Sequence, residues 1–210
     1  CNLVIYDNDS ASFMLDVRDL ALWRGATCLF TGLSFGVRPG SALLLRGANG
    51  TGKTSLLRVL AGLTRPESGT IAWQAEVRPD AMRTLAAYSG HSSALNADLT
   101  IAQNLGFHAR LTGWPGNIAS LLEAVGVGAC ADLEVRYLSA GQRRRGGLAR
   151  LLMSDRPLWL LDEPFTNLDA AGRQLVALRI EVHADDVIAL PRIDRRRAGN
   201  ATDIHHVVGA

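Results

Sequence analysis

A glycine-rich loop that ends in a lysine and a threonine carries the plainest chemistry in the sequence. The run from Gly47 to Thr54 fits the phosphate-binding pattern G-x-x-x-x-G-K-[ST]. Glycines let the backbone curl until its N–H groups point inward at an anion, and a following helix adds the positive end of its dipole. We expect Lys53 to reach the β- and γ-phosphates of a nucleotide and the Thr54 hydroxyl to ligate Mg²⁺. The predicted nucleotide contacts are Gly47, Ala48, Asn49, Gly50, Thr51, Gly52, Lys53, Thr54 and Ser55.

A pair of carboxylates follows a second apolar stretch. Residues 158–161 are Leu-Trp-Leu-Leu, and Asp162 and Glu163 come directly after them. Such a run is typical of a buried parallel strand, and doubly wound sheets bind ligands at the carboxyl ends of their strands. We expect Asp162 to hold Mg²⁺, directly or through water, and Glu163 to orient and polarise an attacking water. A purely structural strand ending is the alternative, which the phosphate loop upstream disfavours.

The hydrophobic pattern predicts the elements that must position these residues. Residues 42–45 predict a buried strand before the loop, and residues 55–61 predict a helix with an apolar face. Strand, glycine turn and helix therefore follow in the order that phosphate binding needs, and this order disfavours a glycine-rich turn with an incidental lysine. Residues 81–104 give mixed signals. Further strands are expected at 14–21, 32–37, 70–73 and 187–190, and a further helix at 118–125.

Length and composition set wider bounds. The 210 residues suffice for one domain with a subdomain and a sizeable core. Hydrophobic residues make up 48% of the chain and the mean hydropathy is +0.10, yet no apolar run approaches the ~18 residues of a membrane span. A net charge of +2 is too small to indicate nucleic-acid binding. The three cysteines show neither metal-ligand spacing nor a disulfide framework, so we expect a reducing compartment.

Residues 1–13 are expected to be an N-terminal extension before a natural start at Met14, without a recognisable signal peptide.

Four stretches together resemble the ATP-binding subunits of ABC transporters. They are residues 47–54, the signature Leu-Ser-x-Gly-Gln at 138–142, residues 160–164, and Thr-Asn-Leu-Asp at 166–169. The signature separates this family from other phosphate-loop NTPases, and the resemblance covers roughly residues 14–180. Within the family, the short length and the wording of several motifs resemble the ATP-binding subunits of bacterial haem exporters in cytochrome c maturation.

The resemblance implies an α/β fold, a phosphate-loop NTPase of ABC type with a central, mostly parallel sheet, an antiparallel β subdomain and an inserted helical subdomain. It places the ATP-binding domain at 14–190, the helical subdomain at about 92–145 and an atypical tail at 191–210. It implies ATP and Mg²⁺ as ligands, integral membrane transporter subunits as partners, and no nucleic acid. Such a chain would lie peripherally on the cytoplasmic face of the bacterial inner membrane.

The resemblance also implies a head-to-tail dimer with two ATP molecules between the subunits. Ser139, Gly141 and Gln142 of one subunit would meet the nucleotide on the other subunit's loop, aided by a helix N-terminus. Asp169 would bridge the two sites. Closure would assemble each site and hydrolysis would release it. The implied activity is ATP hydrolysis coupled to transport, with Glu163 and Lys53 as the catalytic residues.

Several positions depart from the family pattern. The glutamine that the family carries where the chain enters the helical subdomain is matched here only by Ser92. The aromatic residue that stacks on adenine is replaced by Trp23 or by Arg24, whose guanidinium plane can also stack. Gly146 and Gly147 fall within the helix after the signature, where two glycines cost roughly 2 kcal/mol relative to alanines.

The switch histidine of the family is absent from its expected place. Residues 187–190 match the strand that precedes it, but Pro191-Arg192-Ile193 follows where the family has Thr-Thr-His. His205 and His206 lie in a polar segment without a pattern, and we expect them to be solvated rather than metal ligands. Losing one preorganised transition-state contact costs about 10²–10³ in rate, so slow hydrolysis is expected.

Other features favour plain structural roles. Arg143-Arg144-Arg145 is interpreted as the polar face of the signature helix rather than as a patch for anionic lipid or nucleic acid. Trp73 and Trp114 are expected to pack or turn the chain rather than to bind a ligand.

The sequence thus predicts an ABC-type ATPase that drives export, with haem delivery for c-type cytochromes as the favoured function. An ABC ATPase for another exported substrate and a cassette that binds ATP without turnover are the alternatives. An ABC protein acting on DNA or ribosomes is disfavoured, because those proteins carry two cassettes or long coiled-coil insertions.

Overall fold

The chain forms two compact units. The computed structural model describes residues 13–39, 41–46, 48–77, 82–90, 92–164, 166–168, 187–192 and 203–208. Unit 1 comprises residues 1–88, 156–163 and 180–210, and unit 2 comprises residues 89–155 and 164–179. The chain therefore leaves unit 1 after Tyr88, returns at Arg156 and leaves again after Glu163.

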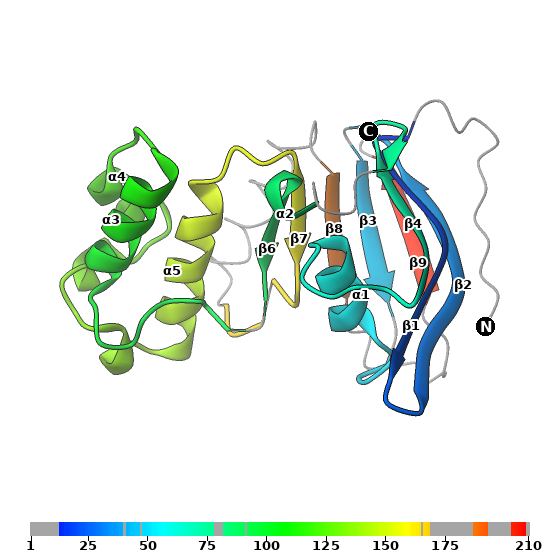
Figure 1. Cartoon of the computed structure of the whole chain (residues 1–210). Coiled ribbons are helices and arrows are strands. Elements are labelled where there is room, and N and C mark those ends of the chain that lie inside the picture. Colours follow the sequence, from blue (N-terminus) through cyan, green and yellow to red (C-terminus); the bar gives the residue numbers. More distant parts are fainter. Residues whose placement is uncertain are drawn as a thin grey trace. The chain divides into compact units, whose positions relative to one another are not determined.

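Unit 1 contains an antiparallel sheet in the strand order β2-β1-β4-β5 (Figure 1). Its bounds are β1 Leu15–Arg24, β2 Thr27–Val37, β4 Ser68–Trp73 and β5 Glu76–Val77. Gly69 lies in β4 at φ +94°, where an added Cβ would lie 2.6 Å from the carbonyl oxygens of Arg18 and Asp19. Only glycine tolerates this approach, and it coincides with the register shift between β1 and β4. The sequence predicts this strand at 70–73, whereas β4 begins two residues earlier and includes Gly69.

The second sheet of unit 1 has the order β6-β7-β8-β3-β9. Its strands are β6 Ala86–Ser89, β7 Leu158–Leu161, β8 Val187–Arg192, β3 Ser41–Arg46 and β9 Asp203–Val208. β8 runs parallel to both β7 and β3, and β9 runs antiparallel to β3. All four residues of β7 are buried, as expected for a strand covered on both faces.

The C-terminal region departs from the sequence prediction. β8 continues through Pro191 and Arg192, two residues beyond the predicted strand. Asp203–Val208, predicted to be a polar and unpatterned tail, forms β9, in which His205 and His206 pair with Leu44 and Leu43 of β3. The physical reason is that three of its six residues are the β-branched Ile204, Val207 and Val208, which favour strands.

Among the described residues of unit 1, the helices are α1 Lys53–Leu60 and α2 Met82–Leu85. α1 buries the face that the sequence predicted, because Leu57 and Leu60 are 0% exposed and Leu56 is 2% exposed. These side chains belong to one hydrophobic cluster with residues of both sheets. Burial against strands therefore fixes the start of α1, and with it the end of the phosphate loop. Strand members of this cluster include Leu15, Val17, Phe35, Leu43, Leu45, Ile71, Leu158 and Leu160.

Unit 2 is helical and has its own hydrophobic core. Its described elements are α3 Ile101–Thr112, α4 Ile118–Ala124, the 3₁₀ turns η2 Gly128–Cys130 and η3 Val135–Tyr137, and α5 Ala140–Leu152. α4 matches the predicted helix, but α3 falls partly in the segment that gave mixed signals. Of the helices among the described residues, none is both long and apolar enough to cross a membrane. The core includes Ile101, Leu105, Leu122, Val125, Val135, Leu138, Ala149 and Met153.

Candidate functional site

The phosphate loop ends at a helix whose first turn has no side-chain cap. Gly50 and Gly52 have φ values of +85° and +96°, a region that glycine enters without strain. Gly52 is the N-cap residue of α1 and supplies no capping side chain. The first N–H groups of a helix have no partner within the helix, so this helix start can bind an anion. Gly47, also predicted for this loop, lies outside the described residues.

Lys53 lies across the loop. It is the first residue of α1, and its Nζ donates a hydrogen bond of 2.7 Å to the carbonyl oxygen of Ala48. Only 8% of Lys53 is exposed, and burial lowers the pKa of the amine from its ordinary value of 10.5, partly offset by the charges of Glu163 and Asp162. A phosphate oxygen is a stronger acceptor than the Ala48 carbonyl, because charged partners shorten and strengthen such bonds.

A hydrogen bond joins the two motifs. The Thr54 hydroxyl oxygen lies 2.9 Å from Oδ2 of Asp162, across 108 residues of sequence. Asp162 directly follows β7 and is 3% exposed. The loop-to-helix junction and the carboxyl end of β7 are therefore brought together, as the sequence predicted from the motifs separately.

Glu163 has a strained backbone. Its φ is +50°, in the left-handed region that non-glycine residues seldom occupy. Such strain costs about 1–3 kcal/mol and clusters at functional positions, where the surroundings hold it. Glu163 also lines the same pocket as Lys53 and Asp162. Its geometry is consistent with a carboxylate held in a fixed direction at the edge of the sheet.

These residues line one pocket of about 640 Å³, within the range of about 300–1,000 Å³ found for small-molecule sites. The loop residues Asn49, Gly50, Gly52, Thr54 and Ser55 form one part of its wall. Leu22, Leu29, Arg24, Arg58 and Thr64 form another part. A nucleotide whose phosphates occupy the loop would thus meet aliphatic and guanidinium groups with its base and sugar.

The structure places the two candidates for stacking on the base differently. Arg24 lines the pocket, whereas Trp23 is 49% exposed and is not among the lining residues. Leu22, Leu29 and Arg58 were missed by the sequence analysis. Arg58 could have been found, because it lies one helical turn after Thr54 on the same face of α1. Leu22 and Leu29 follow only from the pairing of β1 with β2.

Replacing Arg24 by alanine is expected to raise the KM for ATP about five-fold, because a cation stacked on a ring contributes about 1 kcal/mol. The kcat should stay within two-fold, since a contact with the base is equally strong in the ground state and the transition state. Trp23→Ala is the matched control and should leave both constants unchanged. A larger effect of Trp23→Ala than of Arg24→Ala on KM would reverse the assignment.

The signature residues begin a helix. Ser139 is the N-cap of α5, its hydroxyl accepts a hydrogen bond from the backbone N–H of Gln142, and the Gln142 side chain accepts one from the Ser139 N–H. This reciprocal pair is a capping box, so part of the signature has a local structural reason. An added Cβ at Gly141 would lie 3.0 Å from the carbonyl oxygen of Asn167. Asp169 lies outside the described residues, and Ser92 is exposed.

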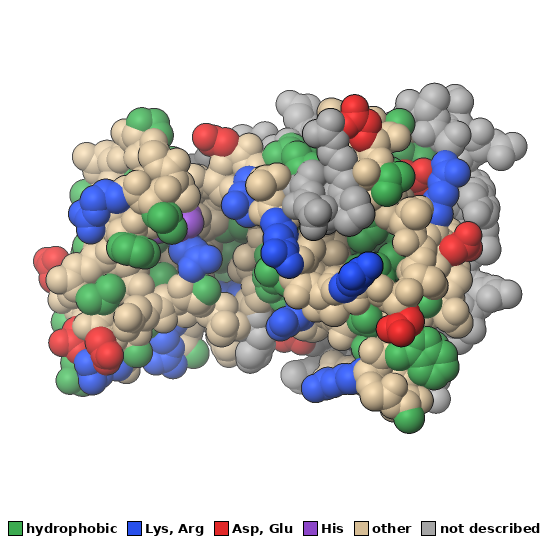
Figure 2. Space-filling view, in the orientation of Figure 1, with side chains coloured by type: hydrophobic (Ala, Val, Ile, Leu, Met, Phe, Trp, Pro, Cys, Tyr) green, Lys and Arg blue, Asp and Glu red, His purple; other side chains and the backbone are tan. Residues whose placement is uncertain are grey.

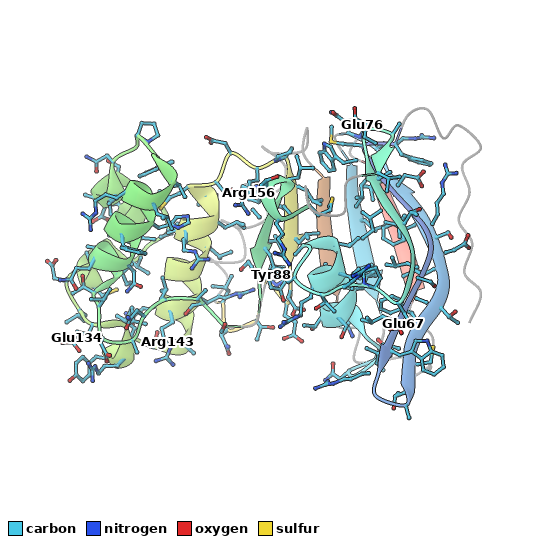
Figure 3. The ribbon with its side chains drawn as sticks, viewed as in Figure 1. Glu67, Glu76, Tyr88, Glu134, Arg143 and Arg156 are labelled. Atoms are coloured by element: carbon cyan, nitrogen blue, oxygen red, sulfur yellow. The ribbon has the colours of Figure 1, made fainter. Side chains whose placement is uncertain are left out.

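The three consecutive arginines of α5 each bond to a different part of unit 2. Arg143, Arg144 and Arg145 donate to the carbonyl oxygens of Leu138, Gly90 and Gly126 at 2.8, 2.8 and 3.2 Å. Arg144 is only 6% exposed, so it is buried rather than part of a polar helix face, and the interpretation from the sequence is wrong for this residue. Figure 3 labels Arg143 on α5, and Figure 2 shows basic side chains dispersed over the visible face rather than gathered. The run therefore holds backbone segments together.

Comparisons with known proteins show to which family the chain belongs. The family model described as "ABC transporter" matches residues 30–166. A cytochrome c biogenesis ATP-binding export protein CcmA from Hyphomonas neptunium is 46% identical over 174 residues, covering 83% of this chain and 86% of that protein. The protein of the same name from Paracoccus denitrificans is 46% identical over 170 residues, covering 81% and 77%.

Two solved structures share the fold. An ATP-binding subunit of an ABC transporter superimposes with a TM-score of 0.73 at 21% identity, covering 85% of this chain and 79% of that one. The cbiO1 protein from Clostridium perfringens, part of the ABC transporter complex cbiONQ, superimposes with a TM-score of 0.69 at 20% identity, covering 87% and 79%. At these identities the likeness shows an α/β fold of ABC-ATPase type. Together with the closely similar sequences, it follows that the chain belongs to the ABC transporter ATP-binding family, and within it to the CcmA proteins.

Proposed function

We propose that this chain is the ATP-binding and ATP-hydrolysing subunit of an ABC transporter that exports or delivers haem during cytochrome c biogenesis. The observation that carries the proposal is the hydrogen bond between Thr54 and Asp162, which joins the phosphate loop to the carboxylate pair in one pocket. The names of the CcmA relatives support export in cytochrome c biogenesis. Haem as the cargo rests on the motif resemblance.

The chain's own residues divide the work. The loop and the start of α1 bind the phosphates, and Lys53 donates to the β- and γ-phosphates in place of the Ala48 carbonyl. Mg²⁺ fits the oxygen atoms of Thr54 and Asp162, which lie 2.9 Å apart and are the hard ligands this ion prefers. When bound there, the ion neutralises phosphate charge. Glu163 accepts a hydrogen bond from the attacking water and directs it at the γ-phosphate.

The assembly extends this proposal. Two copies meet head to tail, so that Ser139, Gly141 and Gln142 at the start of α5 contact the nucleotide of the other copy, and Asp169 bridges the sites. We assign the two sheets of unit 1 to the antiparallel β subdomain and the mostly parallel central sheet. We assign unit 2, residues 89–155 and 164–179, to the inserted helical subdomain that was expected at about 92–145. Membrane-spanning transporter subunits hold the chain at the inner membrane, on its cytoplasmic face.

A cassette with weak turnover is the second candidate, favoured by the end of β8. Arg192 pairs with Arg46, the last residue of β3 before the phosphate loop, so β8 ends beside the loop with Pro191 and Arg192 rather than with a histidine. Neither proline nor the following Ile193 has a side-chain donor. Within the described residues, β8 thus ends at Arg192 without a histidine.

We therefore expect the purified chain to bind MgATP but to turn over about 10²–10³-fold below the ordinary enzyme range of about 1–10 per second. Steady-state phosphate release, measured with and without co-expressed membrane subunits, tests this expectation. Turnover in the ordinary range would contradict the expected loss, and ATP binding with no release at all would identify a binding-only cassette. Failure to bind MgATP under any of these conditions would reject the proposed function itself.

A further inference from the structure

The two glycines within α5 lie against one short stretch of chain. We define the connecting segment as Gly90 together with residues 92–95, which follows β6. An added Cβ at Gly147 would lie 3.1 Å from both the Cα and the carbonyl oxygen of Ser93. At Gly146 it would meet only side-chain atoms, the nearest being Cδ1 of Leu95 at 3.0 Å. The absence of a side chain at Gly147 therefore lets the helix approach the backbone of the connecting segment. At Gly146, by contrast, the neighbouring side chains could move to make room for a methyl group.

Two arginines fasten the same segment on either side of this contact. Arg144 Nη1 donates to the carbonyl oxygen of Gly90 at 2.8 Å, and Arg150 Nη1 donates to the carbonyl oxygen of Ala94 at 2.7 Å. Arg144 is 6% exposed, and burial lowers the pKa of Arg150 from its ordinary value. Residues 144, 147 and 150 are spaced by three and share one side of the helix. We call Arg144, Gly147 and Arg150 the clamp.

The clamp joins two stretches that matter for the site. The connecting segment is where the chain enters unit 2 after β6, and β6 neighbours β7, the strand that ends in Asp162 and Glu163. The signature residue Ser139 is the N-cap of α5, and Gly141 lies in the first turn of this helix. After α5 ends at Leu152, the chain re-enters unit 1 at Arg156 and continues into β7. Within unit 2, the clamp thus couples the incoming chain to the helix that carries the signature.

We propose that Arg144, Gly147 and Arg150 are positioning residues for ATP hydrolysis. They fasten the connecting segment to α5 and so hold Ser139 and Gly141 in one orientation. The signature is then already oriented for contact with the γ-phosphate before ATP binds. This inference rests on the proposed function, in which the signature contacts ATP. The close packing of Gly147 on the connecting segment also gives a reason why glycine, a poor helix former, occurs within α5.

The test compares two substitutions that make the same chemical change in adjacent positions. Gly147→Ala must push the Ser93 backbone away, whereas Gly146→Ala meets movable side chains and serves as the matched control. Both gain helix propensity to the same extent. A displacement of about 1 Å can cost about 10²-fold in rate. The Ser93 backbone must yield by a few tenths of an ångström, so we expect Gly147→Ala to lower kcat about four-fold, with KM and MgATP affinity unchanged. Gly146→Ala should stay within two-fold of the parent. Equal kcat in the two variants would overturn the clamp while leaving the proposed function intact.

Two further readouts use substitutions at Arg150, and the second of them needs no measurable turnover. Arg150→Lys keeps a donor for the Ala94 carbonyl and should retain the parent kcat. Arg150→Met removes the donor and should lower kcat to the same extent as Gly147→Ala. Amide hydrogen exchange of the nucleotide-free chain should become faster in peptides covering residues 92–95 and 139–142 together, in Gly147→Ala and Arg150→Met but not in Gly146→Ala or Arg150→Lys. Unchanged exchange at 139–142 would reject the coupling even if no variant hydrolysed ATP, and an inactive parent would count against the proposed function alone.

Discussion

Replacing Glu163 by glutamine is expected to lower ATP hydrolysis by about 10²–10⁴-fold, the usual contribution of general acid–base catalysis, and to leave MgATP binding intact. The amide keeps the size of the side chain and can still accept a hydrogen bond, but it cannot draw the proton from water. Because the γ-phosphate is then not removed, the variant should accumulate as a dimer in MgATP. Single-turnover phosphate release and size-exclusion chromatography measure the two effects.

The control for this variant is the same change at an exposed carboxylate outside the pocket. Glu67 is exposed and precedes β4, where Figure 3 labels it, and Glu67→Gln should hydrolyse ATP at the parent rate. A Glu163→Gln chain that released phosphate as fast as the parent would show that another group activates the water. Its positive φ would then need a structural explanation.

Replacing Lys53 by alanine is expected to raise the Kd for MgATP about 10²-fold, because hydrogen bonds to charged groups contribute about 1.5–3 kcal/mol. The fold should persist, since the hydrogen bond from the amine to the Ala48 carbonyl lies within the loop itself. Equilibrium binding of a fluorescent ATP analogue measures the affinity, and thermal unfolding without nucleotide checks the fold.

Arg65→Ala removes one positive charge from an exposed position that does not line the pocket, and it should leave the Kd within two-fold. Unchanged affinity in Lys53→Ala would refute the assignment of the phosphate loop. Equal losses in both variants would instead attribute the effect to net charge.

Contiguous motifs were the part of the site that the sequence could predict. Lys53, Thr54, Asp162 and Glu163 each lie in a short run whose spacing has a chemical meaning, and the structure places all four in one pocket. The remaining wall comes from β1 and β2, where Leu22 pairs with Phe30. That pairing depends on strand register, which neighbouring residues alone do not specify.

Several features of unit 2, and one strand of unit 1, could not be predicted from the hydrophobic pattern of the sequence. α3 was missed although Thr100 and Gln103 form a capping box at its start, a signal that hydrophobic periodicity does not contain. Gly146 and Gly147 were expected to be a cost, because their contact with the segment at 92–95 is a tertiary effect. β9 was missed for a related reason, since its six residues acquire a strand's hydrogen bonds only beside β3.

Chemical modification of Lys53 tests the central claim most directly, because Lys53 is the only lysine among the 210 residues. Stable amides with an amine-directed acylating reagent can therefore form only at this side chain and at the terminal amine, and mass spectrometry of the peptides separates the two. Burial lowers the pKa of Lys53, so a larger neutral, reactive fraction is present below pH 10.5 than for a free amine. We predict that saturating MgATP protects Lys53 while the terminal amine reacts at an unchanged rate. Modification of Lys53 at the same rate with and without MgATP would contradict the account, because the nucleotide's phosphates would then not lie on this lysine.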